Sequence, residues 1–119
     1  MKTLSIRPFI GAKNFEISRQ FYQDLGFKET VLMPNLCLFE MKAIAFYLQD
    51  YYVEDWIDNS MVFVEVDDLD GFWENFSALN LASKYEKVRF VPIQNNYWGS
   101  EFFVHDPSGV LWHFGTFSK

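Results

Sequence analysis

His105 and His113 are the two histidines of this 119-residue chain, and imidazole is the side chain best suited to proton transfer or metal binding near neutral pH. Residues 110–114 alternate in character, so His113 points away from the bulky side chains of Val110, Trp112 and Phe114. His113 can therefore line a cleft, either as a hydrogen-bonding group in its wall or as a general base. The spacing of the sequence identifies no carboxylate that would orient the imidazole for the second role.

His105 and the single cysteine are weaker candidates for chemistry. His105 directly precedes Asp106 and Pro107 at the end of an apolar run, where we expect it to meet solvent. Cys37 lies within the apolar run 36–39, where a cysteine is most simply a small buried side chain rather than a nucleophile. We therefore predict no catalytic residue.

Composition and charge narrow the classes of partner. Half of the residues are hydrophobic and 20% are aromatic, which is more rings than a core needs and indicates a ring-lined pocket or an interface. The net charge of −6 argues against nucleic acid and would favour a cationic ligand. No apolar stretch is long enough to span a membrane, and Arg7 and Pro8 interrupt what would be a signal peptide's apolar core. With one cysteine and no internal disulfide, we expect a cytoplasmic protein.

The residues around His113 form a predicted hairpin. Residues 106–109 read Asp-Pro-Ser-Gly, a turn in which Pro107 restricts φ and Gly109 can adopt the positive φ that closes the hairpin. Strands are predicted on both sides, at residues 101–105 and 110–116.

The first half of the chain is predicted to contain one helix and four strands. Residues 3–10 form a strand, and Asn14 caps a helix at residues 15–25 that Gly26 ends. Three short strands follow at residues 27–33, 36–41 and 43–48. The apolar face of the first strand comprises Leu4, Ile6 and Ile10, and the helix stripe comprises Ile17, Phe21 and Leu25.

The second half repeats this order after a connector at residues 49–60. A strand at 61–66 precedes a helix that Asp67 or Asp68 caps and that runs to about Leu79. A strand at residues 87–91 then leads to the hairpin. The helix stripe comprises Leu69, Phe72, Trp73, Phe76 and Leu79. The chain is thus predicted to be one α+β domain, residues 1–119, made of two β-α-β-β-β halves at about 1–49 and 60–119.

Strand alternation also predicts which side chains face away from the helices. The residues expected on this side are Arg7, Tyr47, Met61, Phe63, Glu65, Leu111 and His113. A sheet with one face under a helix needs its other face covered or open as a cleft, so these residues are the candidate wall of a cleft.

The motifs resemble a known superfamily. The turn Asp106-Pro107-Ser108-Gly109, followed by His113 four residues after the glycine, resembles the last hairpin of the vicinal-oxygen-chelate proteins, which include glyoxalase I, extradiol dioxygenases and bleomycin-resistance proteins. The preceding segment Trp98-Gly99-Ser100-Glu101-Phe102 looks most like the bleomycin-resistance branch. The resemblance implies two curled, mixed sheets that form a cleft, often completed by a second subunit.

The superfamily's metal-ligand positions fall, by this resemblance, on Arg7, Tyr47, Met61 and His113. The enzymes fill these positions with histidine, glutamate or glutamine. An arginine side chain stays protonated and has no lone pair to donate, and the methionine thioether is a soft ligand. Because only His113 and Tyr47 could ligate, we predict no metal and no cofactor.

The resemblance therefore implies a non-catalytic homodimer that sequesters a cationic, flat, bleomycin-like ligand in crevices between subunits. Trp98 and Phe63 match aromatic groove residues of that branch, and Glu65 would offset the ligand's charge. The predicted ligand-binding residues are Arg7, Tyr47, Met61, Phe63, Glu65, Trp98 and His113. The alternative is a lyase or dioxygenase of the glyoxalase superfamily with an atypical site, so the assignment of an enzyme stays open.

Overall fold

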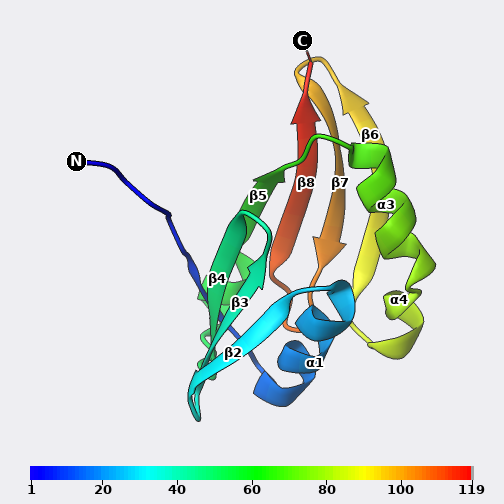
Figure 1. Cartoon of the computed structure of the whole chain (residues 1–119). Coiled ribbons are helices and arrows are strands. Elements are labelled where there is room, and N and C mark those ends of the chain that lie inside the picture. Colours follow the sequence, from blue (N-terminus) through cyan, green and yellow to red (C-terminus); the bar gives the residue numbers. More distant parts are fainter. Residues whose placement is uncertain (119) are drawn as a thin grey trace.

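Two four-stranded sheets form the framework of the computed structural model, which describes residues 1–118 (Figure 1). The strand orders are β1-β4-β3-β2 and β5-β8-β7-β6. The pairs β1–β4 and β5–β8 are parallel, and the other neighbouring strands in each sheet are antiparallel. The repeated topology confirms the predicted α+β fold built from two β-α-β-β-β units.

The first unit has the predicted helix and sheet. Its elements are β1 (Phe9–Gly11), α1 (Phe15–Leu25), β2 (Lys28–Met33), β3 (Leu36–Met41) and β4 (Ile44–Gln49). The helix begins as predicted because the Asn14 side chain accepts the Ile17 N–H, and it ends where Gly26 adopts a φ of 116°. The predicted stripe was wrong at Ile17, which is exposed, because the buried arc is centred one residue further on. The residues of α1 that are buried are Phe15, Ser18, Phe21, Tyr22 and Leu25.

The N-terminal strand is much shorter than predicted. Of this segment only residues 9–11 form a strand beside β4. Pro8 and Arg7 are hydrogen-bonded to Tyr47, and the residues before Arg7 extend away from the body of the molecule (Figure 1). Leu4 and Ile6, expected against the helix, are 90% and 93% exposed. Pro8 has no N–H to donate to the ladder. In this register Ile44, the first residue of β4, would lie opposite Ile6, so residues 1–5 have no residue of β4 to pair with.

The second unit also contains its predicted helix and strands, with three differences, which concern the unpredicted helix α4, the strand β6 and Leu79. Its elements are β5 (Met61–Glu65), α3 (Leu69–Ala78), α4 (Leu81–Lys84), β6 (Arg89–Asn96), β7 (Gly99–His105) and β8 (Leu111–Phe117). The Asp68 side chain caps α3 by accepting the Gly71 N–H. The strand predicted at 87–91 instead covers residues 89–96, with a register shift between Val91 and Gln94, and Leu79 is exposed beyond the end of α3.

The connector and the short helices add little to the core. A single-turn helix, α2 (Glu54–Asp58), occupies the predicted connector and buries only Ile57. No helix within residues 1–118 is long and apolar enough to cross a membrane.

A buried polar network joins the two units beneath the predicted hairpin. The Tyr22 hydroxyl on α1 donates to Asp106 Oδ2 at 2.6 Å and accepts from Trp112 Nε1 at 2.9 Å. Asp106 Oδ1 accepts three backbone N–H groups of the turn, those of residues 108–110. Burial raises the pKa of Asp106, and these hydrogen bonds oppose the rise. The network therefore holds β8, which carries His113, against the first unit.

Candidate functional site

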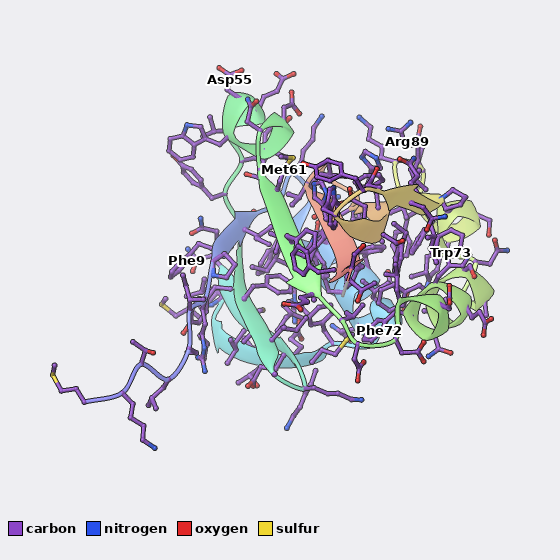
Figure 2. All side chains as sticks on the ribbon, turned by 90° about the horizontal axis from the view of Figure 1, so that it is seen from above. Phe9, Asp55, Met61, Phe72, Trp73 and Arg89 are labelled. Atoms are coloured by element: carbon purple, nitrogen blue, oxygen red, sulfur yellow. The ribbon has the colours of Figure 1, made fainter. Side chains whose placement is uncertain are left out.

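One face of the second sheet is free of helices. Figure 2 shows Phe72 and Trp73 on α3 at one side of this sheet, whereas Met61 and Arg89 lie on the other side. Alternation explains the division, because Phe114 packs against Phe72 of α3 and Trp112 is buried on the same face against the first unit, whereas Met61 is exposed. The second unit thus presents the open sheet face that the alternation predicted.

Aromatic side chains gather on this open face. Strand pairing sets Phe63 beside His113 and His113 beside Phe103, and the next row sets Glu65 and Glu101 on either side of Gly115. Trp98 joins them from the turn between β6 and β7. We call this surface the aromatic face and define it by Phe63, Glu65, Trp98, Glu101, Phe103, His113 and Phe117.

Phe63 is the central ring of the aromatic face. Its ring centroid lies 6.1 Å from that of Trp98, 5.6 Å from Phe117 and 6.2 Å from His113. Gly115 makes room for this ring, because a Cβ at position 115 would lie 2.7 Å from Phe63 Cζ. Since 43% of Phe63 is exposed, the rings form an open platform on which a flat ligand can stack.

Glu101 is the carboxylate that the sequence analysis did not find for His113. Its Oε1 lies 2.9 Å from His113 Nδ1, and both side chains are largely buried. A signal for this pair existed in the sequence: the turn at 106–109 determines the hairpin register, which places Glu101 diagonally across from His113 on the same face. The structure therefore corrects the earlier statement that no orienting carboxylate could be identified.

Arg7 and Tyr47 form a separate pair on the first sheet. Arg7 Nη1 donates to the Tyr47 hydroxyl at 3.1 Å, and the Tyr47 ring stacks on Phe9 with centroids 4.7 Å apart. A groove of about 480 Å³ runs between this region and β5. Arg7, Phe63 and Glu65 line the groove, and Phe46 and Trp112 contribute the buried part of its wall.

The predicted binding residues thus fall into two groups. Phe63, Glu65, Trp98 and His113 share the aromatic face, and Met61 lies on the same side at the exposed start of β5. Arg7 and Tyr47 lie on the other sheet, and the groove connects Arg7 alone with Phe63 and Glu65. Sequence reasoning missed Glu101, Phe103, Gly115 and Phe117 as parts of this surface.

The remaining candidates are Cys37, in the core of the first unit, and His105, which lies on the same open sheet face as His113 but one row away, beside Leu111. Cys37 is completely buried, as predicted for a small core side chain. His105 is partly buried rather than fully exposed, and burial together with the charge of Arg89 lowers its pKa.

The residues at the superfamily's metal-ligand positions do not fit a divalent metal. Arg7 presents N–H donors, Met61 presents an exposed thioether, and the two ligand-capable side chains, Tyr47 and His113, lie on different sheets. The carboxylate beside His113 is engaged by the imidazole. Within residues 1–118 no group of three or more His, Cys, Asp or Glu side chains is arranged to hold a metal ion.

Proteins of known structure share this fold. A bleomycin-binding protein complexed with bleomycin superimposes with a TM-score of 0.82 and 16% sequence identity, over 98% of this chain and 100% of that chain. The bleomycin-binding protein from bleomycin-producing Streptomyces verticillus, complexed with copper(II)-bleomycin, gives a TM-score of 0.81 and 22% identity over 100% and 99% of the two chains.

A superfamily enzyme superimposes less well. Lactoylglutathione lyase from Agrobacterium tumefaciens gives a TM-score of 0.69 and 15% identity, over 97% of this chain and 95% of that chain. No protein-family model and no curated protein matches the sequence. The chain therefore has the fold of the glyoxalase and bleomycin-resistance superfamily, and in its fold it is more similar to these bleomycin-binding proteins than to this lyase.

Proposed function

We propose that this protein is a non-catalytic binding protein that sequesters a flat, cationic, bleomycin-like ligand on the aromatic face. The observation that carries the proposal is the cluster of Phe63, Trp98 and Phe117 beside two carboxylates, Glu65 and Glu101. Stacking and cation–π contacts on such rings contribute on the order of 1 kcal/mol each. The net charge of −6 adds attraction for a cation.

Titration with bleomycin, followed by calorimetry and tryptophan fluorescence, tests this function. Trp98→Ala is expected to weaken binding about tenfold, because a buried ring at a binding site contributes roughly 1–2 kcal/mol. Trp56→Ala is the matched control, since Trp56 is exposed on α2 and packs with Tyr51 outside the aromatic face. Equal affinity of the two variants would remove Trp98 from the site. Absence of binding of bleomycin and related bithiazoles, even at millimolar concentration, would reject the function.

The proposed binding unit is a homodimer. The N-terminal segment, residues 1–8, exposes Leu4 and Ile6 almost completely, and the first sheet exposes Val31, Leu32 and Met33. Apolar side chains in such number are typical of a surface that a second copy covers. A second copy would also be able to place its Arg7–Tyr47 pair opposite the aromatic face and so complete the crevice.

Sedimentation at micromolar concentration tests the dimer. The wild-type protein is expected to sediment with twice the mass of one chain. The dimer of the double variant Leu4→Glu, Ile6→Glu is expected to be weaker and to dissociate at a higher protein concentration than the wild-type dimer. Thr3→Glu serves as a control, because it adds charge to the same segment without removing an apolar side chain. A wild-type species of one chain's mass would contradict the proposal.

A glyoxalase-type enzyme with an atypical site is the second candidate. The His113–Glu101 pair favours it, because an imidazole oriented by a carboxylate is a suitable general base. Turnover of the methylglyoxal–glutathione hemithioacetal would be measured with and without added zinc or nickel. Activity above the buffer rate that His113→Gln abolishes would replace the binding proposal with this one.

A further inference from the structure

The Glu101–His113 pair determines which ring nitrogen of His113 carries hydrogen. The atoms Glu101 Oε1 and His113 Nδ1 are 2.9 Å apart, and the exposed fractions of the two side chains are 13% and 20%. An ionised carboxylate can only accept a hydrogen bond, so Nδ1 must donate. In the neutral imidazole the other nitrogen, Nε2, then has a free lone pair and is an acceptor.

Nε2 of His113 is available to a ligand. Within residues 1–118 Nε2 has no hydrogen-bond partner. Every side-chain nitrogen or oxygen that is buried in this part of the chain has a partner, so Nε2 is not among the buried atoms. Nε2 is therefore accessible rather than sealed in the core. Phe103 packs edge-on against the imidazole at 4.9 Å and Phe63 lies 6.2 Å away, so the acceptor is set among rings.

The polar groups of the aromatic face are mainly acceptors. Glu65 and Glu101 contribute carboxylates, and His113 contributes Nε2. Asn96 donates its Nδ2 N–H to Glu101 Oε2, 3.4 Å away, and the Trp98 indole N–H is the donor that belongs to the aromatic face itself. A ligand that stacks on Phe63 and brings N–H groups can satisfy this acceptor, whereas an equally flat cation without N–H groups leaves it unpaired.

We propose that His113 Nε2 is a specificity-determining acceptor that selects aromatic cations with an N–H donor at the edge of the ring, and that Glu101 is its positioning residue. The inference rests on the proposed binding function and adds the hydrogen-bonding requirement of the ligand. Removal of Glu101 frees the imidazole to change tautomer, so that Nε2 becomes a donor and the selection is lost.

Two dyes of similar shape and equal charge test the selection. 9-Aminoacridinium is a flat cation with N–H donors, and 10-methylacridinium is a flat cation without them. In mildly alkaline buffer the wild-type protein is expected to bind the first about tenfold more tightly, the ratio typical of one hydrogen bond within a binding site. His113→Phe should reduce this ratio to about one, whatever change in affinity the two dyes share. His105→Phe, which changes the other histidine, should preserve the ratio.

The role of Glu101 has its own readout. Nitrogen NMR of histidine-labelled protein is expected to show His113 protonated at Nδ1 in the wild type and a shift toward the Nε2-protonated tautomer in Glu101→Gln. The same variant should also reduce the dye ratio, beyond the loss of affinity that both dyes share because the Glu101 carboxylate attracts cations. A role of Glu101 in folding alone would weaken both dyes equally and would leave the tautomer as it is.

The outcomes separate this inference from the proposed function. Equal affinity of the wild-type protein for both dyes would overturn the selection and leave ring stacking on the aromatic face intact. Protonation of His113 at Nε2 in the wild type would overturn it even if His113→Phe failed to fold. If neither dye binds at millimolar concentration, the selection is rejected, whereas the binding function is decided separately by the bleomycin titration.

Discussion

Replacement of Tyr22 by phenylalanine removes one hydroxyl and with it the side-chain hydrogen bonds between α1 and the hairpin that carries His113. This hydroxyl donates to Asp106 at 2.6 Å and accepts from the Trp112 indole N–H at 2.9 Å. Tyr22 and Asp106 are completely buried, and Trp112 is 3% exposed, so water cannot take the place of the hydroxyl. The variant therefore leaves one buried donor and part of one buried carboxylate unsatisfied.

The free energy of unfolding should fall by about 3–4 kcal/mol. A hydrogen bond to a charged group contributes about 1.5–3 kcal/mol, and a buried donor without a partner costs about 1–3 kcal/mol. The phenylalanine ring keeps the packing of Tyr22 against Phe46, whose centroid lies 4.8 Å away, so no cavity term is added. A domain with a stability of about 5–15 kcal/mol remains folded after a loss of this size, but it unfolds at clearly lower denaturant concentration.

Urea denaturation followed by circular dichroism measures this loss. Tyr85→Phe is the matched control, because the Tyr85 hydroxyl also donates to an aspartate, Asp24, at 2.6 Å, but this pair is only partly buried. The control should lose about 1 kcal/mol. In a Trp112→Phe background the indole donor is absent, so Tyr22→Phe should cost about 1–2 kcal/mol less than in the wild type. If Tyr22→Phe costs no more than Tyr85→Phe, or if the two changes at 22 and 112 are additive, the network does not hold the hairpin in the way described.

Two further predictions concern the platform and the acid stability of the first unit. Gly115→Ala should displace Phe63, because the new Cβ would lie 2.7 Å from the Phe63 ring. We expect the affinity for the ligand to fall by roughly three- to tenfold, with little change in melting temperature. Unchanged affinity would show that the position of Phe63 is irrelevant to binding. Glu29→Gln should cost about 1 kcal/mol near neutral pH, since the hydrogen bonds from Arg19 lower the pKa of Glu29. This stabilisation is complete above the ordinary glutamate pKa of about 4.3 and disappears as pH falls through the lower folded-state value, so urea denaturation across acidic pH should show wild type and variant converging. A constant difference at all pH values would exclude the carboxylate as its source.

Short-range chemistry in the sequence determined most of the local structure. The ends of α1 were predictable because Asn14 caps and Gly26 adopts a positive φ, and both effects depend only on neighbouring residues. Alternation placed Phe63 and His113 on the face away from the helix for the same reason. The Asp106–Gly109 turn likewise closes through hydrogen bonds within itself. The motifs carried by these segments also predicted the fold.

Only the tertiary structure decided how these faces are used. Residues 3–10 read as a strand, but a strand needs a partner, and of the N-terminal residues 1–11 only Phe9–Gly11 form a strand beside β4. Ile17 has the right spacing for the core, yet the direction in which α1 docks leaves it exposed. The Glu101–His113 pair depends on the register between two strands, and the room for Phe63 depends on a missing Cβ on the neighbouring strand. These features arise between segments, so no pattern within a single segment encodes them.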